Sequence, residues 1–207
     1  MRKAATDRTG QHAARRPNVL RGCGAGAVLG GTLFVAWGYL DAPGLSGGTA
    51  LVVRSLSFVV PGLFLAGVTG AGIAASGDRG YRGIGGLGWV GIALALGGSV
   101  MGVVDGVADG DPAREHLTRS GWPAYLSVWL VPLLFGLTIV GVAAVPRRPL
   151  RGLGVAALAM GSFGWCYYLT DPGAVLEARA VHVGSGLLFG LAWVVWGAWV
   201  WSRAARR

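Results

Sequence analysis

The chain has 207 residues, of which 53% are hydrophobic, and a formal net charge of +9 at pH 7. Only 13% of the residues are charged, which excludes a disordered polyelectrolyte. A basic chain could bind nucleic acid, but the basic residues stand beside long apolar stretches, where they fit membrane topology instead. The composition therefore predicts a membrane protein with no nucleic-acid partner.

Six apolar stretches follow one another along the chain. A hydrocarbon core about 30 Å thick requires about 20 helical residues, and continuous apolar character excludes the alternating pattern of membrane strands. The predicted spans are Gly22–Asp41, Leu51–Ile73, Ile84–Asp105, Ala124–Val145, Gly152–Thr170 and Ala180–Trp201. The sequence therefore predicts an all-α integral membrane protein with six transmembrane helices.

The segments outside these spans are short and polar. Residues 1–21 are basic and are predicted to form a disordered cytoplasmic tail. Residues 22–202 are predicted to form a single six-helix transmembrane domain, and residues 203–207 a second basic cytoplasmic tail. Turn-forming residues separate the spans, and no soluble domain is predicted.

Basic residues are concentrated on alternate connecting segments. One set of segments carries most of the 18 basic residues: Arg2, Lys3, Arg8, Arg15, Arg16, Arg21, Arg79, Arg82, Arg147, Arg148, Arg151, Arg203, Arg206 and Arg207. The intervening segments carry most of the acidic residues: Asp41, Asp105, Asp109, Asp111, Glu115, Asp171 and Glu177. Because Lys and Arg are retained on the cytoplasmic face during insertion, both termini are predicted to be cytoplasmic. Anionic lipid head groups are the expected partners of the basic segments.

The spans show a threefold internal similarity. Val60–Phe64 in the second span matches Val131–Phe135 in the fourth, and the fourth shares Leu-Leu-Phe-Gly-Leu with the sixth. The odd-numbered spans carry Gly31-Thr32, Gly98-Ser99 and Gly161-Ser162 at similar depths. Three related helical hairpins would produce these matches, and so would chance among apolar segments built from few residue types. Both interpretations stay open.

Glycine spacing predicts how the spans pack. Two series of glycines four residues apart lie in the first and third spans: Gly22, Gly26 and Gly30, and Gly98, Gly102 and Gly106. Glycine lets helix backbones approach closely, and in lipid this van der Waals contact drives association. The odd-numbered spans are therefore predicted to make the tight central contacts. The bulkier even-numbered spans are predicted to lie outside, with Phe58, Phe64, Phe135 and Phe189.

Few polar groups lie near the predicted midplane. They are the hydroxyls of Thr32, Ser57, Ser99, Thr138 and Ser162, which are expected to bond to their own helix backbone. Trp193 and Trp196 also lie deep, and their indole N–H groups need a partner. A transporter needs a hydrated polar path at this depth, so the pattern favours a bundle that does not transport.

The ionisable residues near the spans gather at the predicted outer ends. The candidate polar cluster consists of Asp41, Arg54, Asp105, Asp171, Arg179 and His182. Arg54 is expected to pair with Asp105 or Asp41, because an unpaired guanidinium below the head groups is costly. Three interpretations stay open. The first gives the residues structural roles, with Arg54 snorkelling to the surface and His182 capping an interface. The second is a vestibule for a small solute or ion, and the third is an enzyme active site.

No catalytic, metal or cofactor signature is present. A rhomboid-type serine protease would need G-x-S-G, but Val100 follows Gly98-Ser99. A membrane haem needs paired histidines, and His182 is the only histidine near a span. The metalloprotease, C-x-x-C and phosphate-loop patterns are also missing from the sequence. No cofactor or metal is predicted, and the sequence favours a protein that is not an enzyme.

Two functions therefore stay open. The first is a non-enzymatic bundle that acts through partners as an accessory or scaffold subunit, bound to another membrane protein or a second copy. The second is a small-solute or ion transporter or channel with an outward-facing polar site near Arg54, Asp105 and His182.

The chain has a single lysine and a single asparagine, a bias typical of GC-rich genomes. The expected location is a bacterial inner membrane.

Overall fold

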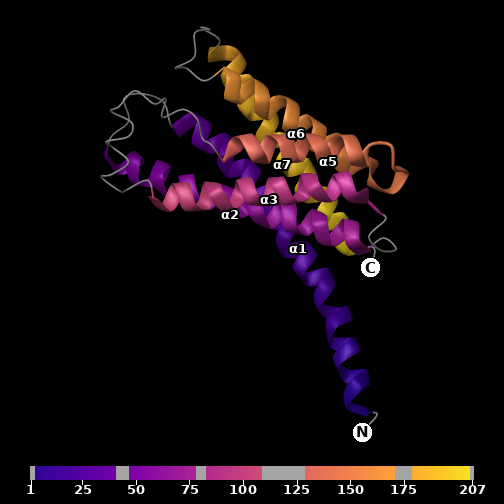
Figure 1. Ribbon diagram of the computed structural model, residues 1–207. Helices are drawn as coiled ribbons and strands as arrows, with labels where there is room; N and C mark the ends of the chain where they lie inside the picture. The colour runs from indigo at the N-terminus through magenta and orange to yellow at the C-terminus, as the bar shows by residue number, and fades with distance from the viewer. Residues whose placement is uncertain (1–2, 41–46, 78–82, 109–128, 171–178, 206–207) are drawn as a thin grey trace.

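The computed structural model describes residues 3–40, 47–77, 83–108, 129–170 and 179–205. Within these ranges the backbone alone is described for residues 3–16, 37–40, 47–54, 57, 58, 77, 108 and 179. The helices are α1 (Lys3–Leu40), α2 (Gly47–Gly77), α3 (Gly85–Ala108), α5 (Leu130–Ala144), the 3-10 helix η1 (Arg148–Leu150), α6 (Arg151–Leu169) and α7 (Arg179–Ala205) (Figure 1). Over these ranges the chain is helical apart from short turns, which confirms the all-α prediction.

Within the described residues, five helices are long and apolar enough to cross a membrane. They contain the segments Pro17–Ala36, Val59–Ser76, Gly85–Val107, Arg148–Leu169 and Ala180–Ala205. Helix α5 has 15 residues, fewer than the roughly 20 that a span requires. The first part of the fourth predicted span, residues 124–128, lies outside the described residues. The described helices are compatible with a helical membrane protein, and a sixth span stays a prediction.

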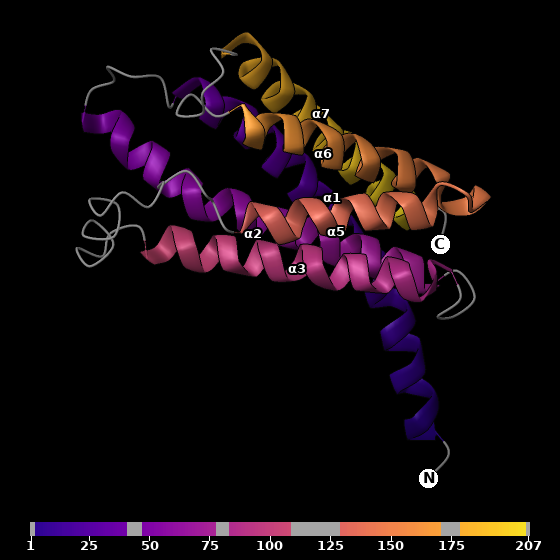
Figure 2. The same ribbon diagram turned by 45° about the horizontal axis from the view of Figure 1, so that its top comes forward.

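Helix α1 extends well beyond its apolar part. It begins at Lys3, so residues 3–21 are helical where the sequence predicts disorder. Its first part projects away from the bundle (Figures 1 and 2). Alanine and arginine are frequent in this segment, and both are good helix formers, so local propensity can support a helix without packing. The division of the chain into two tails and one membrane domain stays a prediction.

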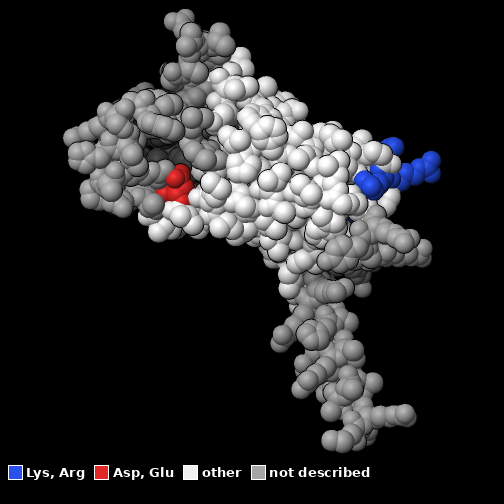
Figure 3. Space-filling model, in the orientation of Figure 1, with Lys and Arg blue, Asp and Glu red and all other residues white. Residues whose placement is uncertain are grey.

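Charged side chains mark the two ends of the bundle. Arg203 of α7 donates a hydrogen bond to the backbone carbonyl of Pro149, so it lies close to the segment that carries Arg147, Arg148 and Arg151. Figure 3 shows blue Lys and Arg side chains at one end of the bundle, here called the arginine end. Asp105, near the end of α3, lies at the opposite end, here called the Asp105 end (Figure 3). Helices α1 and α6 finish at the Asp105 end and α7 begins there. Among the described side chains, positive and negative charge are therefore separated along the bundle axis.

The six α-helices that the structure describes form a closed ring. Each helix packs against its neighbours in chain order, and α1 closes the ring by packing along α7. Helices α2 and α7 also make a smaller contact across the ring. A closed ring of this kind surrounds a central space that side chains must fill, because protein interiors are close-packed.

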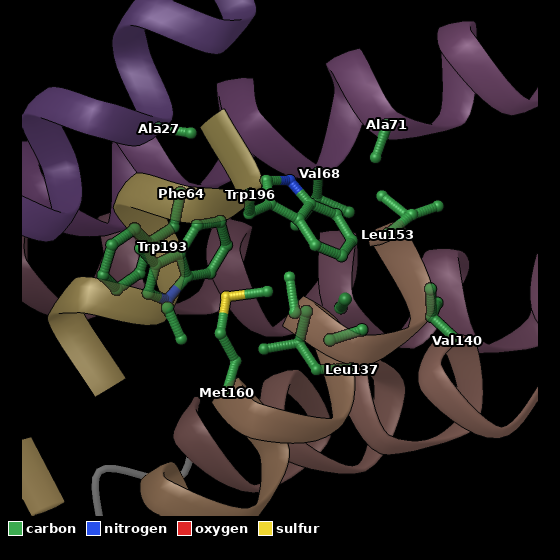
Figure 4. Packing of buried hydrophobic residues seen from close by; sticks show 14 of the residues in the cluster. Ala27, Phe64, Val68, Ala71, Leu137, Val140, Leu153, Met160, Trp193 and Trp196 are labelled. Atoms are coloured by element: carbon green, nitrogen blue, oxygen red, sulfur yellow. The ribbon is translucent and has the colours of Figure 1, made fainter. Parts of the chain in front are cut away.

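Large apolar side chains fill the centre (Figure 4). Trp193 and Trp196 of α7 and Phe64 of α2 are completely buried. The ring of Phe64 stacks on Trp193, with centroids 4.1 Å apart and 3° between the planes. Met160 of α6 and Leu137 of α5 complete the centre. The described interior is therefore an apolar core rather than a channel.

The prediction that the bulky even-numbered spans lie outside is wrong for Phe64 and Phe189. Phe64 is 0% exposed and Phe189 1% exposed, whereas Phe135 is 52% exposed. Phe58 has no described side chain. Glycine contacts bring helices together in pairs around the ring, and the space that remains at the centre requires large side chains. The second and sixth predicted spans therefore supply much of the interior.

Glycines join α1 and α7 backbone to backbone. A Cβ at Gly24 would lie 2.8 Å from the carbonyl oxygen of Gly197, and a Cβ at Gly197 would lie 2.5 Å from that of Gly24. Gly31 and Gly190 face each other in the same way, with 2.8 Å from a Cβ at Gly190 to the Gly31 oxygen. We call these four residues the α1–α7 glycine seam. Neither helix can carry a larger side chain there without moving apart.

The predicted glycine series account for other contacts. A Cβ at Gly26 would lie 3.3 Å from Ala66 of α2, and one at Gly30 would lie 2.9 Å from Leu63 of α2. A Cβ at Gly22 would meet nothing within 4 Å. Gly98 lies against α5, where a Cβ would be 2.5 Å from the backbone nitrogen of Leu133. A Cβ at Gly102 would lie 2.8 Å from Pro61 of α2. Close packing through glycine is therefore confirmed at Gly26, Gly30, Gly98 and Gly102.

The glycines of the repeated Gly-Ser/Thr pairs each lie against a neighbouring helix. Gly31 contacts α7, and Gly98 contacts α5 in its own predicted hairpin. Gly161 of α6 contacts Thr138 of α5, which belongs to the preceding predicted hairpin. Glycine therefore has the same close-packing role in all three pairs, but the helix that it contacts differs. A repeat of three hairpins and chance similarity both stay compatible with this arrangement.

Candidate functional site

The structure places two of the predicted cluster side chains at the same end of the bundle. Asp105 is half-buried near the end of α3, and His182 lies in the first turn of α7. Arg54 and Arg179 belong to α2 and α7, but their side chains lie outside the described part. Asp41 and Asp171 lie outside the described residues altogether. The pairing of Arg54 with Asp105 or Asp41 therefore stays a prediction.

A small pocket lies about one turn inside the Asp105 end, between α1, α6 and α7. It has a free volume of about 30 Å³. Its lining consists of Phe34, Val35, Tyr167, His182, Val183, Gly186 and Leu187. A volume of this size is enough for one or two water-sized groups. We call it the His182 pocket, after the imidazole among these lining residues.

His182 is held against the end of α6. Its Nδ1–H donates a hydrogen bond to the backbone carbonyl of Tyr167 over 3.0 Å. Its ring also stacks on that of Tyr167, with centroids 4.2 Å apart and an angle of 26°. The last carbonyls of a helix lack intrahelical partners, so His182 satisfies one of them from a different helix. His182 therefore joins the end of α6 to the first turn of α7. The structural and the functional interpretation of His182 both stay predictions.

The His182 bond defines which nitrogen remains available. A carbonyl oxygen only accepts hydrogen bonds, so Nδ1 must carry the proton that makes this contact. In the neutral ring, Nε2 then carries a lone pair and acts as an acceptor. Ser185 Oγ donates to the backbone carbonyl of His182 over 3.0 Å, and so does not occupy the ring. Nε2 is the polar atom that the imidazole can offer to the pocket.

Aromatic rings connect the pocket to the apolar core. Phe34 lies edge-on to Tyr167, with centroids 5.3 Å apart and a 68° angle. On its other side Phe34 contacts Phe189 at 4.9 Å and Phe64 at 6.0 Å. The wall of the pocket is therefore continuous with the stacked rings at the centre.

The deep polar groups are mostly satisfied locally. Thr32, Ser99 and Thr138 each donate to the carbonyl four residues earlier, over 2.8–2.9 Å, as expected from the sequence. Trp196 Nε1 donates to the carbonyl of Gly67 over 3.1 Å. Trp193 Nε1 has no hydrogen-bond partner in the described part of the chain. These groups do not form a polar path between the described helices.

No metal centre is visible in the part of the chain that the structure describes. No group of three His, Cys, Asp or Glu side chains there is arranged to hold an ion.

Sequence reasoning identified His182 but missed Phe34, Tyr167 and Gly186. These residues come from three helices, and nothing in their local spacing indicates that they meet. The pocket is a tertiary feature, since it requires α7 to lie between α1 and α6. The one local signal was that Tyr167 lies one turn before the end of an apolar stretch, at the depth that aromatic residues prefer.

Comparisons with known proteins give no relative. The chain matches no protein-family model, no curated protein and no solved structure.

Proposed function

We propose that this protein is a non-enzymatic, multi-pass membrane protein that acts through partners, as an accessory or scaffold subunit. The partner is another membrane protein or a second copy of the chain. The apolar helices that the structure describes support a place in the bilayer. The packed centre of the ring supports a role that needs no passage for a solute.

The main support is the filled ring. Phe64, Trp193 and Met160 are each completely buried where the helices surround the axis. A transport path needs polar side chains that face a hydrated interior. The hydroxyls of Ser99 and Thr138 instead bond to their own helices. Burial of these side chains therefore stabilises the closed ring of helices.

The charge distribution supports the proposed orientation. The described arginines at the arginine end belong to segments that the positive-inside rule assigns to the cytoplasm. We propose six spans, both termini in the cytoplasm, and contact of the arginine end with anionic head groups. Arg203 stacks over Trp199 at 4.8 Å, an arrangement that suits the head-group level. The bacterial inner membrane is the proposed location.

The proposal is tested by isolating the protein in lipid nanodiscs cut directly from its native membrane. Native mass spectrometry then gives the mass of the intact assembly. We expect a defined stoichiometric complex, with a second polypeptide or a second copy of the chain. A single chain with lipids alone, over a range of protein concentrations, would contradict the proposal.

One observation favours a second candidate, a small-solute or ion transporter with a site near Arg54, Asp105 and His182. The His182 pocket lies at the end that the sequence predicts to face outward. Transport would require the centre around Trp193 to open, and this is tested by solute flux into proteoliposomes. Saturable flux that a Trp193→Ala variant accelerates would favour transport over the accessory role.

A further inference from the structure

We propose that the His182 pocket binds the hydroxyl end of a lipid-soluble phenol or alcohol, whose O–H donates a hydrogen bond to His182 Nε2. The pocket lies where α1, α6 and α7 meet, inside the helix ends. The site is independent of the proposed accessory role and would exist whether or not a protein partner binds.

The imidazole is pre-oriented as an acceptor. The Nδ1–H bond to Tyr167 and the stacking on its ring restrain both the position and the plane of the His182 ring. Because Nδ1 holds its proton for the carbonyl, neutral Nε2 accepts and does not donate. A ligand must therefore supply a donor, and an O–H group does so in a single bond.

The described lining favours a neutral ligand. The described residues that line the pocket include no carboxylate to balance a cation and no Lys or Arg to balance an anion. The other described lining residues are Phe34, Val35, Tyr167, Val183, Gly186 and Leu187. Moving a charged ligand from water to such a surface is costly, whereas an apolar molecule with one hydroxyl group can bind there.

The size of the pocket restricts what enters it. About 30 Å³ holds a hydroxyl and the carbon that carries it, but not a whole ring or chain. The rest of the ligand must lie beside the helices in the lipid. This geometry requires an amphiphile with its polar group at one end and an apolar body.

Gly186 provides part of the room. A Cβ at this position would lie 3.0 Å from Cδ2 and 3.1 Å from Cε2 of Tyr167, and 4.0 Å from Phe34. An alanine there would therefore displace the Tyr167 ring by a few tenths of an ångström and occupy the pocket. Gly184, two residues earlier on α7, has nothing within 4 Å of a Cβ and offers a matched control.

The first experiment uses the unaltered protein in lipid nanodiscs and measures equilibrium binding, with empty nanodiscs subtracted for partition into lipid. The probes are para-heptylphenol and its methyl ether, which differ only in the O–H donor. We expect saturable binding of the phenol and about five- to tenfold weaker binding of the ether, since one hydrogen bond is lost. A long-chain alkanol then distinguishes the two classes of ligand, phenols and aliphatic alcohols. If the alkanol binds as tightly as the phenol, the site is assigned to aliphatic alcohols. If it binds more weakly, the site is assigned to phenols.

Variants then connect binding to the pocket. His182→Phe preserves a flat ring but removes the acceptor, so the preference for phenol over ether should disappear. Gly186→Ala should weaken phenol binding about tenfold, while Gly184→Ala should leave it unchanged. Thermal unfolding of each variant, followed in parallel, identifies any that fail to fold.

Three results would overturn the proposal. These are no saturable phenol binding, equal affinity for phenol and ether in the unaltered protein, or a preference that survives in folded His182→Phe. The first two need no variant, so a folding defect cannot obscure them. None of these results bears on whether the chain has a protein partner.

Discussion

Helices α1 and α7 contact each other in two different ways along their length. From the arginine end to the middle, Gly24 and Gly31 lie against Gly197 and Gly190, and the backbones touch. Beyond Gly31, Phe34 of α1 and His182 of α7 both line the His182 pocket. Small residues produce a seam without room for a ligand. Aromatic residues on the same two helices produce a wall with a small pocket beside it.

The largest effect is expected from removing the aromatic packing that supports the pocket wall. Phe64→Ala should lower the free energy of unfolding by about 3–5 kcal/mol, because the ring is fully buried on Trp193 and near Phe34. Reversible unfolding of the protein in mixed micelles measures this change. Phe135→Ala, at the matching position of the sequence repeat, is the control, and its loss should be much smaller because Phe135 is 52% exposed.

A bulky residue in the glycine seam should have the next largest effect. Gly31→Leu should cost about 1–3 kcal/mol, since the added side chain meets the Gly190 carbonyl oxygen and the Cβ of Trp193 on α7. The same unfolding assay measures it. Gly22→Leu, on α1 but facing open space, should change stability by less than about 0.5 kcal/mol. Equal losses for the two variants would show that the seam does not hold the helices together.

Loss of the cap on α6 should have a moderate effect. His182→Ala removes the hydrogen bond to the Tyr167 carbonyl and should destabilise the protein by about 1 kcal/mol. Amide hydrogen exchange should quicken at the end of α6 and not along the glycine seam. Faster exchange at Gly24 and Gly197 would instead indicate that seam and pocket open together.

The smallest effect is expected at the midplane hydroxyl of Ser99. Ser99→Ala should change stability by less than about 0.5 kcal/mol, because the hydroxyl bonds to the Ala95 carbonyl of its own helix. A loss above about 1 kcal/mol, in the same unfolding assay, would reveal a second partner for this group.

The class of the fold could be predicted from the sequence, but the interior could not. Long apolar stretches and turn residues locate helices well, because span length and composition are local properties. The helices are apolar on all sides, so no polar face distinguishes the interior from the lipid-facing surface. Phe64 and Phe135 occupy the same motif, yet one is buried and the other exposed. Whether each of these rings is buried or exposed depends on how the helices close into a ring through the α1–α7 contact.

Only part of the candidate site could be predicted from the sequence. His182 was identifiable because an ionisable residue near an apolar span is rare. Its partner Tyr167 lies fifteen residues earlier, on a different helix, and the bond joins a side chain to a backbone carbonyl. Any residue can supply such a carbonyl, so the sequence carries no trace of the pairing. Gly186 was one glycine among 38, and its role depends on the ring that faces it.

The central claim is that the centre of the ring is dry and closed. The most direct test places a cysteine at Met160, completely buried at the centre, in a protein whose Cys23 and Cys166 are replaced by serine. A charged, membrane-impermeant thiol reagent is then added to either face of sealed vesicles. We predict no labelling of Met160→Cys until the protein is unfolded, while a cysteine at the exposed Arg148 reacts from the cytoplasmic face alone. Labelling of Met160→Cys in the folded protein would reveal a hydrated path and contradict the account.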